Sequence, residues 1–132
     1  MKLSAKSYYA LKGLAHLART QKPGSVAKIS LEEKIPAKYL EKIFQQLKGA
    51  GLLSSHKGVD GGYNLARKAS RINLGQIIGV LEGGVSTAPC SRSACSQDRA
   101  CAEKRFWQSL AQNLNRALEK VTIDQLLSLI HI

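Results

Sequence analysis

The sequence has few aromatic residues, no long apolar run and few acidic side chains. Aromatic residues make up 5% of its 132 positions, too few for the stacking platforms that bind single-stranded nucleic acid. Its apolar runs are far shorter than the roughly 20 residues that cross a bilayer. Residues 1–6 also lack the apolar stretch of a signal peptide. We therefore expect a cytoplasmic protein with reduced cysteines and no membrane partner.

Patterns typical of enzymes are absent as well. The sequence contains no Ser/His/Asp set, no paired-carboxylate site and no phosphate-binding loop. The glycines near residue 60 lack the strand-to-helix context of a nucleotide fingerprint. We therefore expect neither catalysis nor a small-molecule substrate.

Positive charge is abundant and unevenly placed. The chain has 20 Lys+Arg against 9 Asp+Glu, a formal net charge of +11. Residues 1–72 hold 14 of the Lys/Arg and only 4 of the Asp/Glu. Basic charge gathered on one segment is the electrostatic footprint of a protein that binds a polyanion. A solvated basic surface is the alternative.

Hydrophobic periodicity and capping residues predict three helices in the first 50 residues. Ser4 caps a helix that runs to about Thr20, and Ser25 caps a short one that ends near Lys34. Pro36 suits the first turn of a third helix, since it lacks only an N–H that would be unpaired there. One buried stripe of this helix is formed by Leu40, Ile43, Phe44 and Leu47.

The rest of the chain predicts a hairpin and three further helices. Residues 52–55 and 63–65 read as short strands around a glycine-rich turn. Residues 73–82 form a helix, residues 83–101 a Gly-, Ser- and Cys-rich loop, and residues 102–120 a long helix. Thr122 begins a pattern that resembles a capping box for a short terminal helix.

Two short helices, a third helix and a hairpin make a winged helix-turn-helix. The fold class is therefore mainly α, with a small β-hairpin wing and a long C-terminal helix. In this fold the third helix fits the major groove and the hairpin lies along the backbone or minor groove of double-stranded DNA. The candidate DNA-binding residues are Lys28, Pro36, Ala37, Lys38, Tyr39, Glu41, Lys42, Gln45, His56, Lys57, Gly58, Gly61 and Gly62.

Several motifs resemble the IscR/NsrR/CymR family of bacterial winged-helix transcription regulators over nearly the whole chain. These motifs are Met1–Ser4, Tyr9–Leu11, Ile35–Ile43, Leu47–Leu53, Gly61–Arg67, Ile77–Gly83 and the three later cysteines. The resemblance implies a homodimer on a palindromic operator, with the long C-terminal helix crossing to the other subunit. His56-Lys57 departs from the pattern, because many members have an arginine before the glycine.

Three cysteines lie within twelve residues: Cys90, Cys95 and Cys101. Clustered thiolates are soft ligands suited to iron–sulfur clusters or zinc, and a thiol or disulfide switch is a further reading. The family resemblance implies an iron–sulfur cluster ([2Fe–2S] or [4Fe–4S]) that senses iron, redox state or nitric oxide. A histidine that some relatives use as the fourth ligand is replaced here by Lys104. The alternative is a cluster-free regulator or adaptor controlled by thiol oxidation, zinc or a protein partner.

The last long helix carries an apolar stripe that predicts a dimer. A helix separated by a loop from a domain of about 80 residues cannot easily bury such a stripe within its own chain. Its candidate interface residues are Phe106, Trp107, Leu110, Leu114 and Leu118. We accordingly divide the chain into a DNA-binding domain (1–83), a cysteine-rich cluster-binding loop (84–101) and a dimerisation helix with a short terminal helix (102–132).

Overall fold

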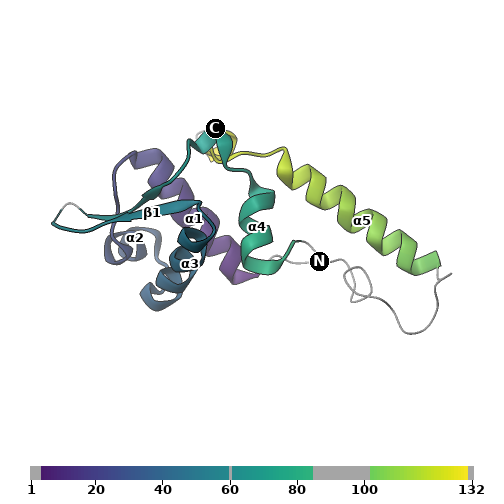
Figure 1. The fold of residues 1–132 in the computed structure, drawn as a ribbon, viewed down its shortest axis with the longest axis horizontal. Coiled ribbons are helices and arrows are strands. Elements are labelled where there is room, and N and C mark those ends of the chain that lie inside the picture. The colour runs from purple at the N-terminus through teal and green to yellow at the C-terminus, as the bar shows by residue number, and fades with distance from the viewer. Residues whose placement is uncertain (1–3, 60, 85–101, 131–132) are drawn as a thin grey trace.

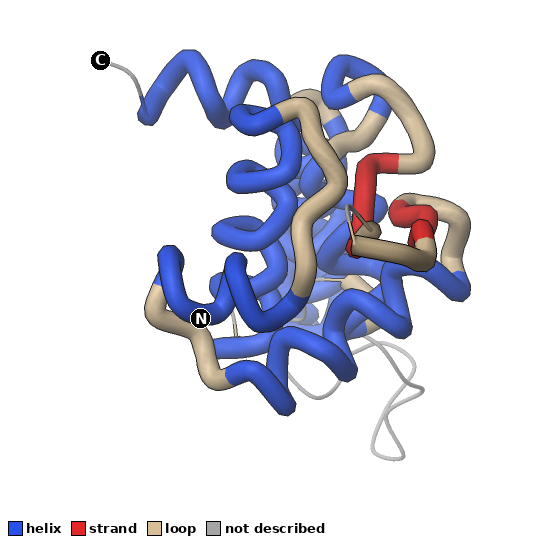
Figure 2. Tube along the Cα trace, turned by 90° about the vertical axis from the view of Figure 1, so that its left-hand side faces the viewer, coloured by secondary structure: helices blue, strands red, loops and turns tan. Residues whose placement is uncertain are grey.

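The computed structural model describes residues 4–59, 61–84 and 102–130. In chain order its elements are α1 (Ala5–Thr20), α2 (Val26–Glu33), α3 (Ala37–Gly49), β1 (Leu53–His56), β2 (Gly62–Leu65), the 3-10 turn η1 (Ala69–Arg71), α4 (Leu74–Glu82), α5 (Ala102–Glu119) and α6 (Ile123–Ile130). The two strands form one antiparallel sheet, and Figure 2 shows these short strands among the helices and loops. The predicted fold class, mainly α with a winged helix-turn-helix, is confirmed.

Helices α1 and α2 begin at their predicted capping residues. Ser4 accepts a hydrogen bond from the Ser7 N–H at 3.4 Å, and Ser25 accepts one from the Lys28 N–H at 3.1 Å. Asn73 and Gln76 form a complete capping box at the start of α4. These side chains satisfy backbone donors that the first turn of a helix leaves unpaired.

Two helix starts differ from the sequence-based expectation. Pro36 is not in the first turn of α3 but caps it, with an extended ψ of 126°, and its carbonyl accepts from the Leu40 N–H at 3.0 Å. At α6 the Gln125 side chain accepts from the Thr122 N–H at 3.1 Å, as in a capping box. The Thr122 hydroxyl, however, hydrogen-bonds the Asp124 carboxylate. The capping box is therefore half formed: the Gln125 side chain takes its part, but the Thr122 hydroxyl is engaged with Asp124 instead of the helix backbone.

The core lies between α1, α3 and α4. The predicted stripe of α3 (Leu40, Ile43, Phe44 and Leu47) is at most 1% exposed and faces Leu14 and Leu17 of α1 within one buried cluster. Gly13 allows close packing of α1 on α3, since a side-chain carbon there would lie 2.8 Å from the Phe44 ring. The opposite face of α3 is left open to solvent.

The hairpin is fastened to the helices by its second strand. β1 and β2 pair antiparallel, from Leu53 opposite Leu65 to His56 opposite Gly62. Tyr63 exchanges two backbone hydrogen bonds with Gly24, of 2.8 and 2.9 Å, in the turn between α1 and α2. Its ring lies 5.1 Å from that of Phe44 in α3. The hairpin is thus held against both the turn and the third helix.

In Figure 1, α5 begins at the end far from the winged helix and runs back toward it, and α6 packs against α1 and η1. The return is fixed by backbone hydrogen bonds from Leu74 N–H to the Val121 carbonyl (2.8 Å) and from Ile123 N–H to the Ile72 carbonyl (2.9 Å). Ile123 is fully buried in the main core. The sequence pattern around Ile123 does not predict this placement of α6.

Candidate DNA-binding surface

The third helix presents a continuous polar face. Its predicted DNA-contacting side chains, from Pro36 to Gln45, are all exposed, while the residues between them are buried. A face of this kind can approach base edges without disturbing the core that holds the helix. The described residues on it are Pro36, Ala37, Lys38, Tyr39, Glu41, Lys42 and Gln45.

A hollow of about 510 Å³ lies between this face and the first turns of α1. Tyr39 and Lys42 line it from α3, and Lys6 lines it from α1. The Tyr39 ring packs edge-on against that of Tyr9, with 5.6 Å between centroids. The tyrosine pair fixes the start of α3 against α1, and the two lysines place positive charge on either side of the hollow.

The hairpin residues lie at one end of the molecule, beside α2 (Figure 1). His56 and Lys57 are exposed at the end of β1, and Lys28 is exposed on α2. The turn is closed by a hydrogen bond of 3.0 Å from Gly61 N–H to the Gly58 carbonyl, with Gly58 at a φ of +112°. Gly62 has a φ of +138°. The structure therefore places the predicted hairpin residues around one tight, glycine-dependent turn.

The lysines of this surface keep their charge available. Within the described part of the chain, Lys28, Lys38, Lys42 and Lys57 make no ion pair. The ion pairs that are seen lie behind the surface, between α1 and α2. An unpaired cationic face is what a polyanion requires.

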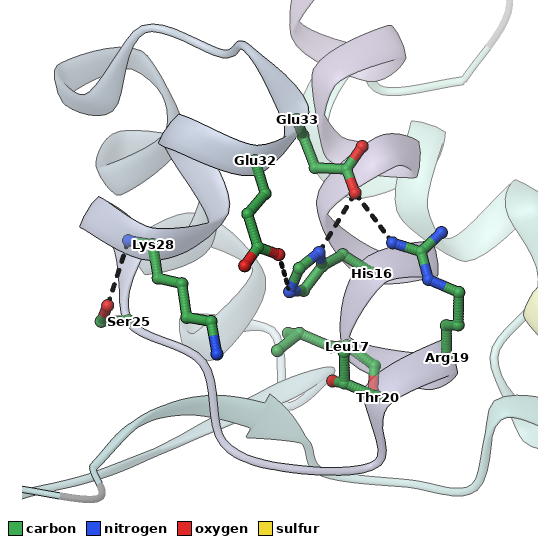
Figure 3. A network of polar contacts seen from close by, with 8 residues as sticks. All are labelled: His16, Leu17, Arg19, Thr20, Ser25, Lys28, Glu32 and Glu33. Atoms are coloured by element: carbon green, nitrogen blue, oxygen red, sulfur yellow. Dashed lines mark hydrogen bonds and ion pairs between the residues drawn. The ribbon is translucent and has the colours of Figure 1, made fainter.

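The Arg19–Glu33 ion pair belongs to a group of polar contacts around His16, which is 2% exposed and lies between two glutamates (Figure 3). Its Nδ1 is 3.1 Å from Glu33 Oε1 and its Nε2 is 3.5 Å from Glu32 Oε2. Arg19 donates to the same Glu33 oxygen at 3.0 Å. The structure shows that it joins the two helices that support α3.

The pKa of Glu33 reflects this network. Partial burial by itself raises the pKa of the Glu33 carboxyl, but hydrogen bonds from His16 and Arg19 and their positive charge outweigh it. The pKa therefore lies below its usual value of 4.5. Glu33 is a carboxylate at neutral pH and holds α2 to α1.

A second carboxylate joins the end of α4 to the start of α1. Glu82 accepts hydrogen bonds from the Ser4 N–H at 3.0 Å and from the Ser7 hydroxyl at 2.8 Å. Ser7 is fully buried. A carboxylate at a helix N-terminus is favourable because the helix dipole is positive there. The position of α1 is thus linked to the helix that leads into the cysteine-rich segment.

The predicted interface residues of α5 are only partly covered within one chain. Trp107, Leu110, Leu114 and Leu118 are half-buried, and Phe106 is 58% exposed. Phe106 and Trp107 pack edge-on, 4.9 Å apart. The helix lies beside α4 and buries Ala111. An apolar strip therefore remains accessible along α5.

The predicted metal ligands Cys90, Cys95 and Cys101 fall outside the described residues. Among the residues that are described, no group of three or more His, Cys, Asp or Glu side chains could hold a metal ion. None of the described helices is long and apolar enough to cross a membrane.

Comparison with known proteins identifies a family. The sequence model of the Rrf2 family, described as an iron-dependent transcriptional regulator, matches residues 3–128. The chain is 33% identical to the transcriptional regulator IscR of Vibrio atlanticus, over 96% of this chain and 75% of that protein. Its fold is similar to that of CymR, the global cysteine regulator of B. subtilis, with a TM-score of 0.81 and 29% identity over 97% of both chains. It is also similar to that of T. potens IscR, with a TM-score of 0.80 and 28% identity over 97% of this chain and 87% of that one.

Proposed function

Because this chain belongs to the Rrf2 family of transcriptional regulators, we propose that it is a homodimeric repressor that binds a palindromic operator in double-stranded DNA. The observation that carries the proposal is the open polar face of α3 beside the fixed hairpin. Glu41 and Gln45 read base edges from this face, while Lys38 and Lys42 contact phosphates or guanine. Lys57 contacts the backbone from the hairpin. This role requires no catalytic residue.

Dimerisation supplies the second recognition helix. The exposed apolar strip of α5, from Phe106 to Leu118, supports the proposal that a second copy of this chain covers it. A two-fold dimer would place its two α3 helices about one DNA turn apart, roughly 34 Å. In this organisation residues 1–83 bind DNA, residues 84–101 form the sensing segment and α5 forms the interface. The buried Ile123 makes α6 a part of the DNA-binding core.

The proposed sensor is an iron–sulfur cluster of [2Fe–2S] or [4Fe–4S] type held by Cys90, Cys95 and Cys101. The donor set fits such a group, because three thiolates within twelve residues are the ligands that these clusters prefer. The description of the matching family as iron-dependent supports the assignment. A bound cluster supplies a centre that responds to iron supply, oxidants or nitric oxide. The link from α4 to α1 through Glu82 offers a route by which the state of this segment biases operator binding.

A cluster-free regulator, controlled by thiol oxidation, zinc or a protein partner, is the second candidate. The likeness to CymR favours it. Visible absorption of protein purified without oxygen separates the two candidates. We expect brown, iron-containing protein whose colour is bleached by air or nitric oxide. Protein that stays colourless and iron-free after anaerobic reconstitution would contradict the iron–sulfur proposal and favour the cluster-free regulator.

DNA binding is tested separately from the cluster. A duplex operator is selected from a randomised 40-base-pair library, and its affinity is measured as the salt concentration is raised. The net positive charge of residues 1–72 predicts a steep fall in affinity. Affinity that does not change with salt would contradict the proposed function.

A further inference from the structure

The buried imidazole of His16 faces a carboxylate at each of its two ring nitrogens (Figure 3). Nδ1 lies 3.1 Å from Glu33 Oε1, and Nε2 lies 3.5 Å from Glu32 Oε2. A neutral imidazole carries one N–H donor and one lone pair, whereas the protonated ring donates from both nitrogens. Only the protonated ring suits both contacts, because a neutral ring would turn a lone pair toward one of the carboxylates.

Cationic side chains also lie near this ring. Burial by itself raises the pKa of Glu33, but its contacts with His16 and Arg19 lower it, so a charged carboxylate faces Nδ1. Arg19 lies 3.0 Å from the same Glu33 oxygen, and Lys22 and Lys28 line a hollow of about 320 Å³ beside the ring. Both lysines are exposed, so water screens their charge. The two carboxylates, which contact the buried ring directly, therefore favour a bound proton.

The ring connects α1 to α2, and α2 leads directly into α3. Ile29 of α2 is fully buried in the same core cluster as the apolar stripe of α3. The Ser30 hydroxyl donates to the Ile35 carbonyl, and the Ile35 N–H donates to the Ser30 carbonyl at 3.0 Å. Ile35 directly precedes Pro36, the cap of α3. A change in how α2 sits on α1 is therefore passed to the first turn of the helix that carries the polar face.

We propose that His16 is a proton-dependent positioning residue: its protonated ring holds α2 on α1 and fixes α3 for operator binding, and loss of the proton loosens this junction. Histidine is the side chain whose charge ordinarily changes between pH 5 and 8. Because the proton strengthens both contacts, its stabilisation of the operator-binding conformation is present at low pH and is lost as pH rises. This inference rests on the proposed DNA-binding function, to which it adds a response to pH that does not involve the cysteines.

The test measures affinity for the operator duplex selected from the randomised library. It is measured at constant ionic strength at about pH 6 and about pH 8, across the range in which histidine changes charge. The key variant is His16→Gln, whose amide is uncharged at both pH values. His56, exposed on the hairpin, is a second histidine near the proposed DNA, so the comparison is repeated in a His56→Gln background. Circular dichroism checks that each variant is folded.

The wild type should bind the operator more tightly at the lower pH. Removing His16 should make the fall in affinity between the two pH values about threefold to tenfold smaller, since one linked proton changes an equilibrium by at most tenfold per pH unit. The same reduction should appear with and without His56→Gln. If His16→Gln instead lowers affinity by the same factor at both pH values, His16 has a packing role only and the proposal is overturned.

Nuclear magnetic resonance of the wild type tests the junction without a substitution and without DNA. The shifts of the His16 ring report its protonation, and the amide shifts of Ile29 in α2 and Leu40 in α3 report the junction. We expect all of these shifts to change together as pH is raised. A His16 ring that is already neutral at about pH 6, or amides that do not follow the ring, would overturn the proposal.

This inference and the proposed function fail in different ways. If the wild type binds the duplex with a steep salt dependence and His16→Gln leaves its pH dependence unchanged, the role of His16 is wrong and the DNA-binding function stands. If the wild type shows no salt-dependent binding, both proposals are wrong.

Discussion

Gly62 lies directly against the backbone of Gly24: a side-chain carbon on Gly62 would come within 2.4 Å of the Gly24 carbonyl carbon and oxygen. The hairpin therefore approaches the turn before α2 more closely than any other residue type would allow. With its φ of +138°, Gly62 also adopts a backbone conformation that other residues rarely reach. This close approach lets Tyr63 form its two backbone hydrogen bonds with Gly24, which hold the hairpin against the turn before α2.

Gly62→Ala should destabilise the fold by about 1–3 kcal/mol, because the methyl group collides with backbone that cannot move aside. Urea denaturation measures the change. Gly49→Ala is the control, since a side-chain carbon at Gly49 in α3 meets nothing within 4 Å. It should be neutral or stabilising by up to about 1 kcal/mol. Equal stability of Gly62→Ala and the wild type would mean that the hairpin is not held against Gly24.

Substitutions on α3 and on the hairpin should affect DNA binding differently. Gln45→Ala or Glu41→Ala should relax the choice of base at one operator position, at a cost of about 1–3 kcal/mol for the preferred base. Lys57→Ala should weaken binding to all sequences about equally, because phosphates carry no sequence information. Affinities for a set of single-base operator variants distinguish the two patterns. If Gln45→Ala lowers the affinity for all operator variants equally, Gln45 does not contact a base.

The network around His16 predicts how stability depends on pH. The pKa of Glu33 is lower in the folded protein than its usual 4.5, so its ionised form stabilises the fold above that pH. This stabilisation is lost as pH falls through the folded pKa. Glu33→Gln should reduce stability at neutral pH by about 1–2 kcal/mol, and its difference from the wild type should shrink below pH 4.5.

Glu32→Gln is the matched control for this prediction. The Glu32 side chain is 47% exposed, and its oxygen lies farther from His16, at 3.5 Å. Glu32→Gln should therefore reduce the stability of the fold less than Glu33→Gln does at every pH. Thermal denaturation between neutral and acidic pH gives both curves. A pH-independent difference between Glu33→Gln and the wild type would show that the network does not depend on the charge of Glu33.

The proposed dimer can be disrupted at α5. Replacing Leu110 and Leu114 with Glu would bury unpaired charges in an interface, which costs several kcal/mol. Sedimentation should then show a folded monomer with weak operator binding. Gln112→Glu and Asn113→Glu together form the control, because both residues are exposed on the same helix. A Leu110/Leu114 variant that stays dimeric at micromolar concentration would place the interface elsewhere.

The cysteines should act as a set. Ala in place of Cys90, Cys95 or Cys101 should abolish the visible absorption of the anaerobic protein and alter its operator affinity, since each removes a cluster ligand. The fold should persist, because the described core is formed by residues between Ala10 and Leu81 together with Ile123. Ser93→Ala, in the same segment, should keep both colour and affinity. Full operator binding by a colourless triple variant would separate DNA binding from any cluster.

The sequence could predict the elements whose causes are local. The Ser4 and Ser25 caps and the apolar spacing of α3 lie within one or two helical turns, where side chain and backbone determine the structure together. Pro36 shows the limit of this precision, because cap and first turn differ by one residue. The polar face of α3 followed from the same periodicity. The candidate DNA-binding face of α3 could therefore be predicted from the sequence alone.

Only the tertiary structure decided which distant residues meet. Nothing local to Gly24 indicates that it pairs with Tyr63, and nothing near Ile123 indicates that it enters the core beside Ile72. His16 likewise acquires its partners, Glu32 and Glu33, only when α1 packs on α2. Local hydrogen bonding and periodicity determined the helices and their exposed faces. Packing of one buried surface on another determined how the hairpin, α6 and the His16 network are placed, because such contacts depend on the shape of the whole core.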